Sequence, residues 1–150
     1  MVNIQTAGLR DFSGLRHIER MCFPHDAWPL IDLIAVLSLP GVVRLKAEVD
    51  GCMVGFIAGE QRPSQGVAWI ATLGVLPEHQ RKGIARALLE ECEERLIADV
   101  IRLCVRLYNT AAIRLYESSG YLRLETWSRY YRDGGDALVM EKKNNTRRGE

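Results

Sequence analysis

The sequence predicts an α+β protein with a central, mixed but mostly antiparallel sheet of about seven strands and about four helices. Apolar residues recur at every second position in some segments, as in strands, and at helical spacing in others. The order of the segments is mixed, with antiparallel strands first and a strand-helix-strand-helix series before a final hairpin. With 150 residues, 47% of them hydrophobic and 26% charged, we expect residues 1–150 to form one domain with a substantial core.

Each element has its own signal. We expect strands over residues 2–7, 43–49, 52–59, 67–75, 100–107, 121–131 and 136–142, and helices over 11–22, 30–38, 83–98 and 109–117. Prolines break the chain after the first helix, and Asp50-Gly51 is a strong hairpin signal. The strand over 67–75 is almost wholly apolar, which predicts burial on both faces. The acidic residues of the third helix read as a solvated face, and residues 144–150 as a frayed tail.

Composition excludes several classes of function. The net charge is +1, so no global field would recruit nucleic acid or an anionic membrane. The longest apolar runs are too short to span a bilayer, and the N-terminus does not read as a signal peptide. Four scattered cysteines show neither a CxxC pair nor zinc-ligand spacing: Cys22, Cys52, Cys92 and Cys104. We therefore expect reduced thiols in a cytoplasmic protein without a metal site.

The most informative segment joins the strand over 67–75 to the helix that follows. After Leu73-Gly74-Val75 and a proline turn comes a basic loop ending in glycine, and the helix begins at once. Free backbone N–H groups, the positive end of the helix dipole and cationic side chains meet there, which predicts a site for a phosphorylated ligand. The loop matches neither a P-loop nor a dinucleotide fingerprint. Taken alone, it could also be a polar strand-to-helix connection.

A second motif lies downstream, Asn109-x-x-Ala112-x-x-x-Tyr116-x-x-x-Gly120-Tyr121. Together with the glycine loop, it makes the chain resemble the GNAT acetyltransferase superfamily over its whole length, with Ala85 in place of a second glycine. The resemblance implies a GNAT fold in which two parallel strands splay apart around acetyl-CoA.

The resemblance also implies roles for individual residues. The pyrophosphate of acetyl-CoA would be held at Gln80, Arg81, Lys82, Gly83, Ile84, Ala85 and Arg86. The pantetheine arm would lie along Leu73, Gly74 and Val75 and contact Asn109. Tyr116 would protonate the departing thiolate, although in isolation it would read as a core aromatic residue.

Within the superfamily, the chain looks most like the RimI type, which acetylates the N-terminal amine of ribosomal proteins. The supporting segments are Cys22-Phe23-Pro24 with Trp28, the strand Trp69-Ile70-Ala71-Thr72-Leu73-Gly74-Val75, Arg129-Tyr130-Tyr131 before Gly134, and Asp136-Ala137-Leu138-Val139-Met140. This resemblance implies an acceptor site walled by Phe23, Pro24, Trp28, Tyr130 and Tyr131. The alternative is that Phe23, Pro24 and Trp28 close one end of the core.

The residue that would deprotonate the amine is missing from its usual place. RimI-type enzymes have a glutamate in a strand written L-E-V-R, and this chain has Leu103-Cys104-Val105-Arg106. Candidate substitutes are Cys104, whose pKa Arg102 and Arg106 could depress, Glu60 at the end of the preceding strand, and His79. For His79, a place lining the cofactor groove is the stronger expectation. An unreactive, half-buried thiol is the alternative for Cys104.

The missing glutamate favours an acceptor amine of low pKa. Near neutral pH, deprotonating an α-amine costs about 1 kcal/mol or less, and a lysine roughly 4 kcal/mol. We therefore expect a protein or peptide N-terminus as acceptor, on a monomer or a homodimer. A small-molecule amine acetyltransferase and a non-catalytic acyl-CoA-binding module are the alternatives.

Overall fold

The computed structural model describes residues 2–24, 26 and 28–144. Its strands are β1 (Val2–Thr6), β2 (Val42–Val49), β3 (Cys52–Arg62), β4 (Val67–Val75), β5 (Val100–Arg106), β6 (Leu122–Trp127) and β7 (Ala137–Lys143). Its α-helices are α1 (Phe12–Cys22), α2 (Leu30–Ser38), α3 (Ile84–Arg95) and α4 (Thr110–Ser118). The predicted α+β class is confirmed.

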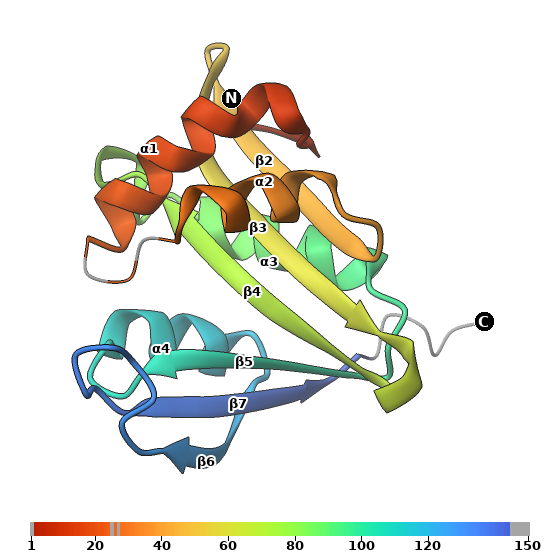
Figure 1. The fold of residues 1–150 in the computed structure, drawn as a ribbon, viewed down its shortest axis with the longest axis vertical. Coiled ribbons are helices and arrows are strands. Elements are labelled where there is room, and N and C mark those ends of the chain that lie inside the picture. Colours follow the sequence, from red (N-terminus) through yellow and green to blue (C-terminus); the bar gives the residue numbers. More distant parts are fainter. Residues whose placement is uncertain (1, 25, 27, 145–150) are drawn as a thin grey trace.

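The strands form one sheet in the order β1-β2-β3-β4-β5-β7-β6. All neighbouring strands are antiparallel except β4 and β5, which are parallel. This pair is hydrogen-bonded only from Val67–Ile70 to Val100–Leu103. Beyond those residues the strands diverge, so that the sheet opens between β4 and β5 (Figure 1).

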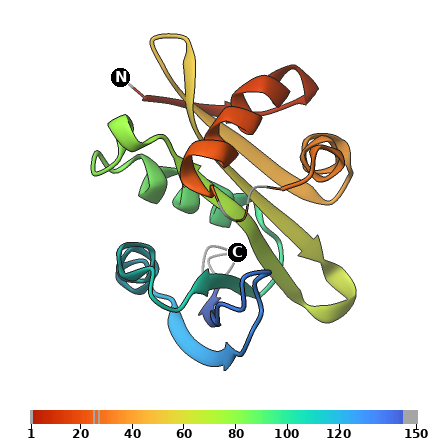
Figure 2. The same ribbon diagram turned by 60° about the vertical axis from the view of Figure 1, so that its left-hand side comes forward.

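The helices cover both faces of the sheet. Helices α1 and α2 lie on one face, and α3 lies on the other, behind β3 and β4 in Figure 1 and to their left in Figure 2. Glycines allow the close approach of α3. A Cβ on Gly59 would lie 3.0 Å from the sulfur of Cys92, and a Cβ on Gly55 would lie 3.1 Å from Leu88. The core is thus formed between the sheet and the helices. Its fully buried residues include Leu15, Ile18, Phe56, Leu88 and Leu89.

Three sequence-based expectations are wrong at the level of single residues. Glu93 is not on the solvated face of α3 but 4% exposed, because it accepts hydrogen bonds from the Tyr121 hydroxyl (2.8 Å) and the Lys142 ammonium (2.9 Å). Asn144 is not frayed, since its side-chain amide donates to the carbonyls of Leu96 and Ala98. The remaining predicted tail, 145–150, lies outside the described residues.

The third correction concerns the final hairpin. Strand β6 ends at Trp127, so Tyr130 and Tyr131 lie in the β6–β7 loop rather than in a strand. Arg129 has a left-handed backbone (φ +52°), and its N–H donates to the Asp136 carboxylate at 3.0 Å. This local turn removes the chain from the sheet before the two tyrosines.

Strand β4 is less buried than an unbroken apolar strand predicts. Its ends are buried, but Trp69, Ala71, Thr72 and Leu73 are partly exposed. For Ala71 to Leu73 the reason is the divergence of β5, which leaves these residues without a neighbour on one edge, whereas Trp69 still pairs with Arg102. Among the described residues, no helix is long and apolar enough to cross a membrane.

Candidate active site between the diverging strands

The glycine loop is built from backbone as predicted. Gln80, Arg81, Lys82 and Gly83 are exposed, and both Arg81 (φ +63°) and Gly83 (φ +82°) are in the left-handed region. Gly83 is the N-cap of α3, and no side chain caps the helix or places an acid in its first turn. The first N–H groups of α3 therefore form a concave group of donors suited to an anion.

The side chains around this loop have structural partners of their own. Ile84 is 3% exposed and packs in the core, and Ala85 is partly buried against it, so at these positions the backbone is what a ligand could reach. The guanidinium of Arg86 donates to the Ser118 hydroxyl at 2.6 Å, which ties α3 to α4. The amide of Gln80 donates to the Val75 carbonyl at 2.9 Å and fixes the loop to the end of β4.

The end of β4 is closely packed against α1. A Cβ on Gly74 would lie 3.2 Å from both the Cys22 sulfur and Ile18, so a larger residue there would crowd α1. The Val75 carbonyl also accepts from the Cys22 thiol at 3.2 Å. Leu73, by contrast, lines a cavity at the opening between β4 and β5.

This cavity, of about 190 Å³, brings together four of the predicted catalytic and cofactor residues. Tyr116 from α4, Cys104 from β5, Leu73 from β4 and Asn109 all line it. Tyr116 is 8% exposed and packs edge-on against the Tyr121 ring, with 5.8 Å between centroids. Burial raises the pKa of Tyr116 to about 12, so its hydroxyl is protonated at neutral pH and able to donate.

Asn109 has a role that the motif alone did not indicate. It is the N-cap of α4, and its side-chain oxygen accepts from the Ala112 N–H at 3.2 Å. The cap fixes where α4 begins and therefore where Tyr116, two turns later, meets the cavity.

Cys104 does not have the environment of a reactive thiolate. Burial raises the pKa of its thiol, and a hydrogen bond with Tyr130 offsets only part of that rise. The expectation that neighbouring arginines lower the pKa of Cys104 is wrong, because Arg102 binds Glu141 at 3.0 Å and Arg106 binds Asp26 at 2.7 Å. Cys104 is therefore a neutral thiol at pH 7.

The other two candidate bases lie elsewhere. Glu60 is paired with Arg62 at 3.3 Å, its side chain is 39% exposed, and it lines a separate groove of about 430 Å³ beside α2. His79 lies in the 3₁₀ turn Pro77–His79 before the glycine loop. Neither residue lines the cavity that contains Tyr116.

A wider cleft of about 640 Å³ adjoins the cavity and shares several of its walls, among them Trp28, Cys104 and Tyr131. Its aromatic residues include a continuous series from Trp69 through Trp127 and Tyr130 to Tyr131, with ring centroids 6.1, 5.5 and 5.0 Å apart. Of the predicted acceptor residues, Trp28, Tyr130 and Tyr131 line this cleft. Phe23 lines the smaller cavity, and Pro24 is exposed and lines neither. Trp127 was missed, although its place before the tyrosine pair was a usable signal.

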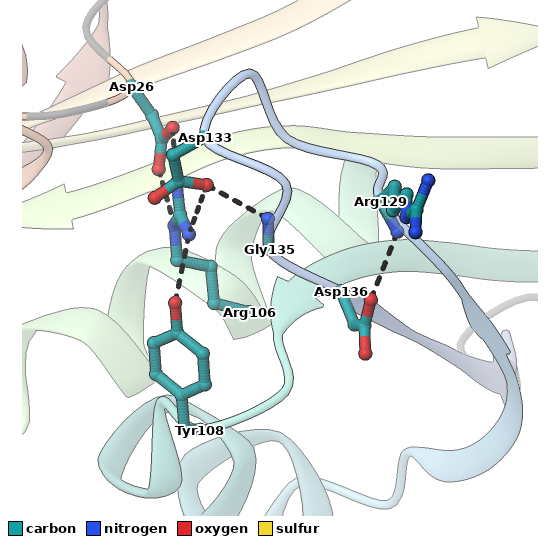
Figure 3. Close-up of polar contacts among 7 residues, drawn as sticks. All are labelled: Asp26, Arg106, Tyr108, Arg129, Asp133, Gly135 and Asp136. Atoms are coloured by element: carbon teal, nitrogen blue, oxygen red, sulfur yellow. Dashed lines mark hydrogen bonds and ion pairs between the residues drawn. The ribbon is translucent and has the colours of Figure 1, made fainter.

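Sequence reasoning also missed the ionic cluster that joins the two loops bordering the cleft. Figure 3 shows Arg106 between the carboxylates of Asp26 and Asp133. Arg106 makes two 2.7 Å hydrogen bonds to Asp26, in the α1–α2 loop, and one of 3.2 Å to Asp133, in the β6–β7 loop. Its guanidinium also lies 4.3 Å from the Tyr131 ring centroid. The Asp26 hydrogen bonds raise the pKa of Arg106 further, so its guanidinium stays charged at any working pH.

Within the described ranges, no three His, Cys, Asp or Glu side chains are grouped as metal ligands would be.

Comparison with known proteins agrees with this geometry. Residues 12–121 match the model of the acetyltransferase (GNAT) family. The N-alpha-acetyltransferase RimI of Mycobacterium tuberculosis is 36% identical over 121 residues, covering 78% of this chain and 76% of that protein. The ribosomal-protein-S18-alanine N-acetyltransferase of Escherichia coli superimposes with a TM-score of 0.84 at 29% identity, covering 95% and 94% of the two chains.

A third neighbour shares the fold and was solved with acetyl-CoA. The NAA60 protein of Arabidopsis thaliana superimposes with a TM-score of 0.84 at 21% identity, covering 97% of this chain and 99% of that one. The glycine loop, the diverging strands and the buried tyrosine thus occur in a chain that belongs to the GNAT acetyltransferase family.

Proposed function

We propose that this protein transfers the acetyl group of acetyl-CoA to the N-terminal α-amine of a protein or peptide, as a single domain acting in the cytoplasm. The observation that carries the proposal is the small cavity between β4 and β5. Tyr116 lines it on the α4 side, and on the α1 side it adjoins the open aromatic cleft. A thioester and an amine could therefore meet there from opposite faces of the sheet.

The cofactor half of the proposal rests on the glycine loop. The uncapped N-terminus of α3, with Arg81 and Lys82 beside it, would hold the pyrophosphate. The pantetheine arm would follow the edge of β4 at Leu73 to Val75, where β5 no longer pairs with it. The neighbour solved with acetyl-CoA supports this assignment at the level of the fold.

The proposed chemistry is direct attack within a ternary complex. The neutral amine attacks the thioester carbonyl, so that a C–N bond forms and the C–S bond breaks. A backbone N–H of β4 would stabilise the oxyanion. Tyr116 would donate its proton to the leaving thiolate, which its raised pKa permits because the hydroxyl is still protonated at neutral pH.

The acceptor half rests on the cleft and on the relatives. The RimI protein of M. tuberculosis and the E. coli enzyme are named for acetylating α-amines or a ribosomal-protein alanine. The cleft is open and lined by rings, which suits the first residues of an extended peptide.

Acetyl transfer from labelled acetyl-CoA tests the proposal with four acceptors. They are a lysine-free peptide beginning with alanine, the same peptide beginning with methionine, an N-blocked peptide with an internal lysine, and a free polyamine. We expect label on the first two only. Equal labelling of the blocked peptide, or faster labelling of the polyamine, would exclude N-terminal specificity.

A further inference from the structure

Glu19 is a buried carboxylate that the proposed mechanism has not used. It lies on α1 between Ile18 and Cys22, on the helix stripe that faces the sheet, and is 2% exposed. Its Oε2 accepts a hydrogen bond from the Thr72 hydroxyl of β4 at 2.9 Å. Its Oε1 is also buried and has no hydrogen-bond partner among the described residues.

Such an arrangement needs an explanation. Leaving a buried acceptor unsatisfied costs about 1–3 kcal/mol, and more when the group is charged. The contact with Thr72 explains one oxygen as a link between α1 and β4. It does not explain why the second oxygen is left without a donor, which suggests that the donor arrives with a ligand.

The location of Glu19 indicates which ligand. Glu19 lines the same cavity of about 190 Å³ as Tyr116 and Cys104. Glu19 comes from α1 on one face of the sheet, and Tyr116 comes from α4 beside α3. The carboxylate therefore lies on the side of the aromatic cleft, from which the acceptor amine would enter, and opposite the proposed acid.

We propose that Glu19 is the general base, accepting the proton of the attacking α-amine on Oε1 as the C–N bond forms. This role rests on the proposed acetyl transfer. The amine nitrogen loses one proton to Glu19, and the CoA thiolate gains one from Tyr116. Solvent then carries the proton from the Glu19 carboxyl to the Tyr116 phenolate, which restores the starting state.

The electrostatics fit this role better for Glu19 than for Cys104. Burial raises the pKa of Glu19. The hydrogen bond from the Thr72 hydroxyl and the nearby backbone N–H of Trp28, which forms no hydrogen bond with Oε1, offset part of the rise. A carboxylate with a raised pKa is a stronger base that still ionises readily, whereas the Cys104 thiol stays protonated near neutral pH.

Protonation of Glu19 should produce an acid limb in the pH dependence of the rate, and the neighbouring titratable groups can be compared with it. Those lining the same cavity are Asp26, Cys104, Arg106, Tyr116 and Tyr131, and Cys22 follows on α1. Burial raises the pKa of both cysteines and both tyrosines, which places their titration on the alkaline side. Asp26 is bound by Arg106. An acid limb of kcat/KM that shifts when the surroundings of Glu19 are changed would therefore identify Glu19 as the base.

The first test is Glu19→Gln, which keeps the size of the side chain and an acceptor for Thr72. With a free N-terminal peptide we expect kcat to fall by about 100-fold or more, partial recovery at alkaline pH, and unchanged CoA affinity. Because a buried carboxylate is removed, the variant should be as stable as the parent or more stable above about pH 5. Glu93→Gln is the matched control. It alters another buried glutamate, one bound to Tyr121 and Lys142 away from the cavity, and should keep kcat.

The second test is Thr72→Val, which leaves the carboxylate but removes the hydrogen bond that lowers the pKa of Glu19. The acid limb of kcat/KM should move to higher pH, measured against the parent with the same peptide. The role of Glu19 would be overturned, with the proposed function intact, if the parent protein acetylates free N-termini and the Glu19→Gln variant is equally active. An acid limb that does not move in Thr72→Val would overturn it in the same way. A parent protein inactive on every free N-terminus would overturn the proposed function and this role with it.

Discussion

The two sides of the site differ in which parts of the chain form them. One is a single short segment, and the other combines side chains from many elements. On the proposed cofactor side, seven consecutive residues from Gln80 to Arg86 supply a helix terminus, two left-handed residues and two exposed cationic side chains, Arg81 and Lys82. On the acceptor side, the cavity and cleft combine side chains from α1, the α1–α2 loop, β4, β5, α4 and the β6–β7 loop.

The difference predicts which half tolerates sequence change. Backbone N–H groups at a helix N-terminus are present whatever the side chains are, so the cofactor side depends mainly on backbone conformation. The acceptor side depends on contacts such as Arg106 with Asp26, which are 80 residues apart. A single substitution there can move a whole loop. The following predictions test this contrast, from the largest expected effect to the smallest.

Tyr116→Phe should lower kcat by about 100-fold while leaving the Kd of CoA unchanged, because loss of a general acid removes catalysis rather than binding. With the pKa of Tyr116 at about 12, the parent should lose no activity through its deprotonation below about pH 10. Steady-state kinetics measure kcat and its pH dependence, and calorimetry measures the Kd of CoA. Tyr121→Phe removes a buried hydroxyl bonded to Glu93 and should lower the Tm with activity retained. Equal kinetic loss in both variants would contradict the acid role.

Asp26→Asn should raise the KM for the peptide about 10-fold with little change in the KM for acetyl-CoA. The substitution removes one charge from a bidentate pair, and such charge-assisted hydrogen bonds contribute about 1.5–3 kcal/mol. Asp133→Asn, which alters the single, more exposed contact of Arg106 in the other loop, should change the peptide KM less. A rise in the KM for acetyl-CoA instead would show that the cluster positions the cofactor side of the site rather than the acceptor side.

Lys82→Glu should weaken CoA binding by about 10-fold at low salt. Reversing one exposed charge near a phosphate changes the interaction by about 1–2 kcal/mol in water, and added salt screens it. The peptide KM should not change. Lys143→Glu makes the same charge change at the end of β7 and serves as the control for net charge. A salt-independent loss would point to a damaged loop backbone rather than to lost attraction.

Cys104→Ala should alter kcat by less than about threefold and leave its pH dependence unchanged, because the pKa of the buried thiol is raised and the thiol is neutral at pH 7. A rate–pH profile from about pH 5 to 9 checks this. Loss of a limb in that range would make Cys104, rather than Glu19, the proton acceptor.

The glycine loop and the buried tyrosine motif could be predicted because they are local. Their spacing is set by one turn and one helix, so Gly83 and Tyr116 each lie where the sequence pattern puts them. The base could not be predicted in that way. Position 104 was expected to supply it, and the buried carboxylate of the cavity belongs to a helix 85 residues earlier. Its one sequence signal was a charged residue on the apolar stripe of Leu15, Ile18 and Cys22.

By itself, the sequence determined the α+β class, the order of the elements, the uncapped helix terminus after the glycine loop and the place of Tyr116, because periodicity and turn chemistry act over a few residues. Only the tertiary structure decided that Glu60 lies apart, that Cys104 is a neutral thiol, that Arg106 joins two distant loops, and that Glu19 lines the cavity and has a buried, unpaired oxygen. These depend on burial and on contacts across the sheet, and both arise only when the helices pack onto the diverging strands.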